Sequence, residues 1–161
     1  MSYGLTAAAA MTNLAAMLQA APALKGTAAD GSDVQVKDGN ENAEPGALDV
    51  ISVGWQGPDE DDTAADGSLA GEDYQAVRDR ETYTFRCALA TLDGDNVIAA
   101  GRARAFAILG VVGQVIVDDS TLRGTVMSAS LGTWSLRQDN TDSGTETRIL
   151  FTVDCDAFTN Q

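Results

Sequence analysis

Two acidic clusters are the groups in this chain that come nearest to a metal site. Residues 59–62 read Asp-Glu-Asp-Asp, and Asp93 and Asp95 flank a glycine. Carboxylate oxygens are the ligands that Ca²⁺ prefers, and the second cluster begins like a calcium-binding loop. Its sixth position is Ile98 instead of glycine and its twelfth is Arg104 instead of glutamate, and the first cluster also lacks both residues. We therefore predict no metal site, with weak cation binding at the surface as the alternative.

Side chains for catalysis are equally scarce. The chain has no histidine, which removes the usual general base near neutral pH, histidine-based triads and most transition-metal sites. It has no phosphate-binding loop and no dinucleotide-binding fingerprint. Cys87 and Cys155 form no metal-ligand spacing and lie on the apolar faces of predicted strands, so we expect buried core thiols. A disulfide would require those strands to be close in space. The sequence predicts neither enzyme activity nor a cofactor.

The remaining charged candidates suit an assembly surface. Four consecutive acids cannot share a buried site, so residues 59–62 must face water or a basic partner. Arg102 and Arg104 are two positions apart on a predicted helix and point in different directions. At least one should be exposed and available for an ion pair across a subunit boundary, although simple solvation is the alternative. The candidate assembly residues are Asp59, Glu60, Asp61, Asp62, Arg102 and Arg104.

Two helices are predicted from apolar spacing. An alanine-rich helix over residues 5–24 carries an apolar stripe at spacings of three and four and is closed by Pro22 and Gly26. A second helix follows Asp95, which is well placed to cap it. Its apolar spacing continues through residues 111–117, although β-branched residues there would also suit a strand.

Strands are predicted around residues 34–37, 49–55, 80–90, 132–138 and 145–157, the last two as a hairpin. Ile51, Val53 and Trp55 are the expected core residues of the second strand, and Trp134 is expected in the core or an interface. The order predicts an α+β fold, with one small mixed or antiparallel sheet of about four to five strands packed against two main helices. We expect one domain over residues 1–161 with a long acidic loop at about 57–79.

Charge and hydropathy limit the partners. The chain has 10 basic and 24 acidic residues, a formal net charge of −14, and 44% hydrophobic residues. A surface with this charge repels nucleic acid and anionic membranes. The first helix has no basic residue before it and contains Thr12, Asn13 and Gln19, so it is a poor signal peptide or membrane span. We predict a soluble protein made in a bacterial cytoplasm, with no membrane partner.

The segment over residues 80–126 combines a strand, a Gly-Asp turn, a helix and a second turn. Together with residues 50–57 and 147–155, it resembles the tail terminator proteins of long-tailed, siphovirus-like bacteriophages. The likeness covers most of the chain as a diffuse pattern without a catalytic signature. It implies a small α/β virion protein, assembled in the host cytoplasm, that forms a hexameric ring at the head-proximal end of the tail. The implied partners are other copies of itself, the tail tube protein and the head–tail connector or stopper.

A closed ring requires each subunit to present two different complementary faces. Genomic DNA would pass through the ring without stable binding, because an acidic channel repels phosphate. We expect the loop over residues 57–73 to be mobile in the free protein and ordered on assembly, or else to be a solvated insertion with no role. The alternatives are another neck protein, such as a tail-completion or connector protein, and a cytosolic ligand-binding module or enzyme subunit with a deep pocket.

Overall fold

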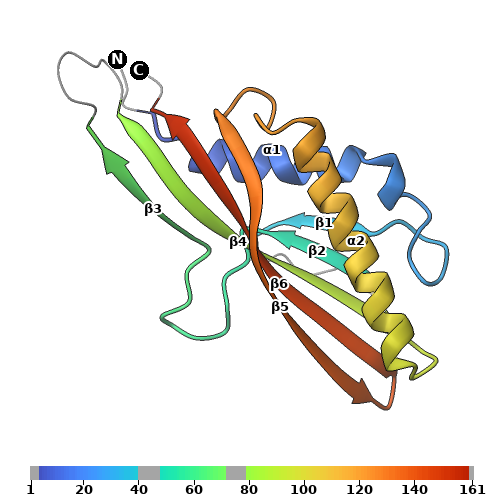
Figure 1. Ribbon diagram of the computed structural model, residues 1–161. Coiled ribbons are helices and arrows are strands. Elements are labelled where there is room, and N and C mark those ends of the chain that lie inside the picture. The colour runs from blue at the N-terminus through green and yellow to red at the C-terminus, as the bar shows by residue number, and fades with distance from the viewer. Residues whose placement is uncertain (1–3, 40–47, 72–78, 160–161) are drawn as a thin grey trace.

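The computed structural model describes residues 4–39, 48–71 and 79–159, which form one six-stranded sheet with α1 and α2 on one side (Figure 1). The elements are α1 (Ala7–Ala20), a 3-10 helix (Pro22–Leu24), β1 (Gln35–Asp38), β2 (Asp49–Val53), β3 (Ala65–Ala70), β4 (Arg80–Asp93), α2 (Ile98–Asp118), β5 (Ser128–Thr141) and β6 (Gly144–Phe158). The predicted α+β class and the two main helices are confirmed. The sheet has more strands than the four to five that the sequence predicts.

Strand β4 organises the sheet. The strand order is β1-β2-β4-β6-β5, and β3 pairs with β4 on the side where β2 also pairs. β1 runs parallel to β2, and all other pairings are antiparallel. β3 uses the first part of β4, Arg80–Phe85, and β2 uses the later part, Cys87–Thr91. The length of β4 thus accommodates two short strands along one of its edges.

The extra strand, β3, lies within the segment 57–79 that the sequence assigns to a loop. Its sequence, Ala-Asp-Gly-Ser-Leu-Ala, is poor in the β-branched and aromatic residues that favour strands. Pairing with β4 therefore determines its conformation, and propensity alone misses it. Residues 72–78 of the predicted loop lie outside the described residues.

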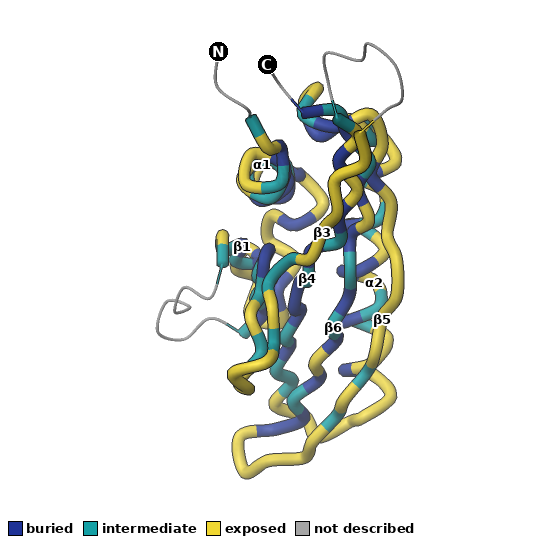
Figure 2. The backbone as a smooth tube through the Cα atoms, turned by 90° about the vertical axis from the view of Figure 1, so that its left-hand side faces the viewer, coloured by how far each residue is buried: buried dark blue, intermediate teal, exposed yellow. Residues whose placement is uncertain are grey.

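The core lies between the sheet and the helices. β4 and β6 alternate between buried and more exposed residues, as Figure 2 shows along both strands. Tyr83, Phe85, Cys87 and Leu89 are buried on the helix side of β4, as their spacing predicts. β6 contributes Ile149, Phe151, Val153 and Cys155 to the same core cluster.

The second predicted strand ends earlier than expected. Ile51 and Val53 are buried, but Trp55 is only half-buried, so its assignment to the core is wrong. β2 stops at Val53 because Gly54 has a φ of +72°, a conformation that glycine adopts readily. The alternation of faces does not continue through this turn.

Both helices pack their predicted faces. Leu14 and Leu18 of α1 are fully buried, and Ala105, Val112 and Ile116 bury the inner face of α2. α2 extends through residues 111–117, so the helical interpretation of that β-branched segment is confirmed. α2 is long and apolar enough to cross a membrane by length and composition, but its inner face belongs to the core.

The cap predicted for α2 is wrong. The N-cap residue is Val97, and it makes no side-chain cap hydrogen bond. The backbone N–H of Asp95 instead donates to Asp93 Oδ1 at 3.1 Å, in a local turn. Asn96 follows with a positive φ of 54°, so the chain needs one further turn residue before the helix can begin.

Candidate assembly surfaces

The two thiols belong to the core. Cys87 and Cys155 are both free and buried, as predicted. Burial raises the pKa of each thiol to about 12. Since the thiolate is the nucleophile and the metal ligand, these protonated thiols are poorly reactive at neutral pH. Within residues 4–39, 48–71 and 79–159, no group of three or more histidine, cysteine or acidic side chains could hold a metal ion.

Arg104 is committed to an interaction inside the chain. Its Nη2 contacts Asp49 Oδ1 and also donates to the Leu92 carbonyl oxygen at 3.2 Å. Its Nη1 lies 3.9 Å from Asp93 Oδ2. The Asp49 side chain is fully buried, and burial raises its pKa although Arg104 acts in the opposite direction. Arg104 therefore links β2, β4 and α2 within the chain.

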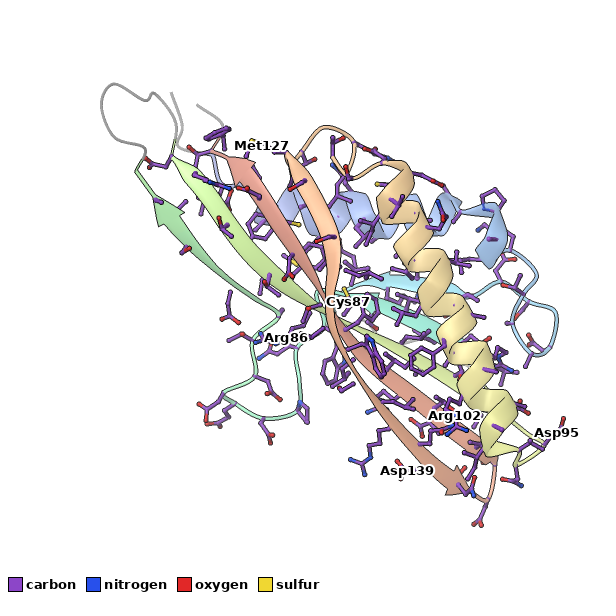
Figure 3. All side chains as sticks on the ribbon, in the orientation of Figure 1. Arg86, Cys87, Asp95, Arg102, Met127 and Asp139 are labelled. Carbon is purple, nitrogen blue, oxygen red and sulfur yellow. The ribbon has the colours of Figure 1, made fainter. Side chains whose placement is uncertain are left out.

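Arg102, by contrast, is exposed on α2. Figure 3 shows it on the helix near the end of the molecule that carries Asp139. The sequence correctly predicts that at least one of the two arginines is exposed. It does not identify Asp49 as the partner of Arg104, because Asp49 is the first residue of β2 and resembles an ordinary strand boundary.

The acidic residues before β3 form a turn. The backbone N–H of Asp62 donates to the Asp59 carbonyl oxygen at 3.0 Å, and the Asp59 N–H donates to Asp62 Oδ2 at 3.2 Å. Asp59, Glu60 and Asp61 are exposed and Asp62 is half-buried. We call residues 59–62 the acidic turn. It belongs to the segment between β2 and β3, which lies across the molecule from Arg102 in Figure 3, so one chain does not bring these opposite charges together.

The sheet face away from the helices carries neutralised arginines. Outward-facing positions of β4 and β6 include Arg80, Arg86 and Arg148, and Arg137 lies opposite Arg148 on β5. Each pairs with an acid, in the pairs Arg80–Asp156, Arg86–Asp66, Arg137–Asp139 and Arg148–Glu146. This face therefore has mixed charge and no uninterrupted basic stripe.

Large apolar side chains are exposed on the β5 side, on the β3 side and at the start of α2, where Val97 is 49% and Ile98 42% exposed. On the β5 side, Trp134 is 58% exposed, Val117 75% and Leu131 36%. The Trp134 ring meets Phe106 of α2 edge to face, with ring centroids 5.0 Å apart. We call this the β5 rim. Trp134 is therefore not a core residue, and its place in an interface stays a prediction.

On the β3 side, Leu5 is 56% exposed and Leu69 48%. They border a hollow of about 360 Å³ between the start of α1 and β3, whose lining also includes Gly67, Glu81 and Tyr83. Thr6 donates from its backbone N–H and its hydroxyl to Glu81 Oε2, both at 2.8 Å, which fixes the carboxylate at the base of the hollow. We call this the β3 hollow. This hollow could not be predicted from the sequence, because its β3 side falls in a segment that the sequence assigns to a loop.

Comparison with solved structures shows a likeness over nearly the whole chain. No model of a known protein family matches the chain, and no curated protein matches it. Among solved structures, it is similar to a chain described as "Virion of native gene transfer agent (GTA) particle". The two share 18% sequence identity at a TM-score of 0.58, over 98% of this chain and 96% of the other. The likeness shows that nearly the whole chain has the fold of a protein found in a virion particle.

Proposed function

We propose that this protein is a structural component of a phage-like virion. The observation that carries the proposal is the fold similarity to a gene transfer agent virion chain over almost the full length of both proteins. Buried, protonated thiols and internally paired arginines give the described surface little chemistry beyond binding.

Within this class, we propose the role of tail terminator. In this role the chain forms a hexameric ring at the head-proximal end of the tail tube, stops tube polymerisation and offers the surface that docks to the head–tail connector or stopper. The resemblance of residues 80–126 to tail terminators supports this role. Two exposed apolar regions on different elements also support it, because a head-to-tail ring needs two different faces on each subunit.

Passage of genomic DNA fits the electrostatics. The formal net charge of −14 repels phosphate, and the outward arginines of the sheet are each neutralised by an acid. Without clustered unpaired cations, DNA finds no deep binding minimum along this surface. We propose that the acidic turn and Arg102 contribute to assembly contacts and that Arg104 does not.

Electron microscopy of a phage lysate carrying a nonsense mutation in this gene tests the role. A terminator predicts overlong tails detached from full heads, because tube growth is no longer capped. Tails of normal length lying free beside heads would instead identify another neck protein, such as a tail-completion or connector protein. Normal infectious particles would exclude a structural role and return the chain to a cytosolic function.

A further inference from the structure

We propose that the β5 edge of one copy pairs with the β3 edge of the next copy, which seats Trp134 in the neighbour's β3 hollow. The sheet would then continue from subunit to subunit. The inference rests on the proposed ring, and it identifies the two faces that close it.

Both strand edges are open. Among the described residues, β5 pairs only with β6 over Ser128–Thr141, and β3 pairs only with β4 over Ala65–Ala70. Eleven of the fourteen β5 residues are exposed, and only Ala129 is buried. An edge of this kind presents unpaired N–H and C=O groups that can pair with another chain.

The remaining edge of the sheet is covered. Gln19 of α1 donates from its side chain to the Val36 carbonyl oxygen of β1 at 3.1 Å. The chain that enters β1 is also held, because the Val34 N–H donates to the Leu24 carbonyl oxygen at 2.9 Å. The fold thus covers the β1 edge and leaves the backbone edges of β3 and β5 without a neighbouring strand among the described residues. This arrangement is expected if those two edges pair with neighbouring copies.

Strand direction suits the pairing. β3 is antiparallel to β4, β4 to β6, and β6 to β5, so β3 and β5 run in opposite directions within one copy. Copies related by rotation about an axis along the strands keep these directions. Neighbouring β5 and β3 edges would therefore meet antiparallel, the more stable pairing per residue.

The side chains also match across this junction. Leu131, Trp134 and Leu136 lie on the helix side of β5, opposite Val153, Phe151 and Ile149 of β6. On the same side of β3, Gly67 and Leu69 lie opposite Tyr83 and Glu81 of β4. A continued sheet places like sides next to each other, so Trp134 meets the β3 hollow. Gly67 and Glu81 both line the hollow, with Tyr83 packed closely against Gly67, and the Glu81 carboxylate can accept the indole N–H.

Charge favours the same partner. The acidic turn precedes β3, and exposed Arg102 lies on α2 one turn before Phe106, which contacts Trp134 of the β5 rim. The Arg137 side chain of β5 is also 80% exposed, but it already pairs with Asp139. The joined edges bring these opposite charges onto one boundary between copies. Two β5 edges facing each other would instead bring the arginines together, and two β3 edges would bring the acidic turns together. Complementary charge therefore favours the head-to-tail contact over either symmetric one.

Two single variants and their mixture test the proposal. Trp134→Arg disables the β5 rim and Leu69→Arg disables the β3 hollow, and both positions are exposed, so the monomer should fold. Size-exclusion chromatography with light scattering should show rings for the wild type and monomers for each variant alone. An equimolar mixture should give a one-to-one dimer that grows no further, because only one working interface remains. Ala20→Arg adds the same charge at an exposed position of α1 and should assemble like the wild type.

Several results would overturn the proposal. One is a ring formed by Trp134→Arg, and another is a homodimer of either variant alone. The proposal also fails if the mixture stays monomeric, or if the wild type stays monomeric up to its solubility limit. Circular dichroism checks the fold of each variant, and Trp134→Ser and Leu69→Ser repeat the test with less perturbation. The lysate experiment decides the terminator role separately. Rings built through other surfaces would refute this interface and leave that role intact.

Discussion

The two arginines of α2 show how differently one helix can use the same residue type. Arg104 points inward, where it neutralises the buried Asp49 and approaches Asp93. Arg102 lies two positions away and is exposed beside the β5 rim. The inner arginine completes interactions within the fold, whereas the outer one adds charge to a surface that a neighbour can use. Assembly should therefore change the surroundings of Arg102 and leave those of Arg104 unchanged.

The largest expected effect is at the inner arginine. Arg104→Leu would leave Asp49 buried without its counter-charge, and we expect it to lower the free energy of unfolding by about 3 kcal/mol. The matched control, Arg102→Leu, should change it by less than about 0.5 kcal/mol. Urea denaturation of both variants near neutral pH measures the difference. Equal losses in the two variants would show that the inner ion pair contributes little to stability.

At the β5 rim, a substitution should weaken assembly more than it weakens folding. Trp134→Ala removes a mostly exposed ring whose main contact inside the chain is Phe106, so we expect a stability loss of about 1 kcal/mol in the monomer. Assembly should fail, since aromatic residues at the centre of interfaces carry much of the binding energy. Thermal unfolding and light scattering of the same sample separate the two effects. A stability loss as large as that expected for Arg104→Leu, with assembly intact, would place Trp134 in the core.

The sequence predicts the parts of this fold that depend on local periodicity. The alternation along β4 and β6 and the apolar spacing of α2 are each set by neighbouring residues, and the structure confirms them. β3 escapes prediction because its strand conformation comes from pairing with β4. The paired residues are 10 to 20 positions apart, from Ala70 with Arg80 to Ala65 with Phe85, so local propensity does not reveal the pairing. The hollow beside it could not be predicted without that strand.

The candidate site residues divide along the same line. Solvation of the acidic turn follows from like charges that cannot be buried together, so composition alone predicts it. The different roles of Arg102 and Arg104 depend on Asp49, which is distant in sequence and reaches Arg104 only through the packing of β2, β4 and α2. Helical spacing shows that the two arginines diverge, but not which one turns inward.

The stability that the buried Asp49 contributes should also depend on pH. Burial raises the pKa of Asp49 in the folded state above its ordinary value. As pH rises, the unfolded chain loses this proton first, so the contribution of Asp49 to stability falls between the ordinary and the raised pKa and stays low above both. As the pH rises from about 4 toward neutrality, the free energy of unfolding should therefore fall more, or rise less, for the wild type than for Asp49→Asn. Urea titrations across this range test the sign, and identical slopes would contradict it.

The smallest effect on folding is expected at the acidic turn. Replacing Asp59, Glu60 and Asp61 by their amides should leave the monomer within about 0.5 kcal/mol of the wild type, because these side chains are exposed. If the turn faces the arginines of a neighbour, the same change should weaken assembly at low salt and reduce its dependence on ionic strength. Amide substitutions at Asp30, Asp33 and Asp38, on the β1 side, remove equal charge away from both open edges and control for net charge. Equal responses of the two triple variants would show that assembly depends only on the total charge. The contrast between Arg104, which pairs inside the chain, and Arg102, which is exposed, would then apply to folding and not to assembly.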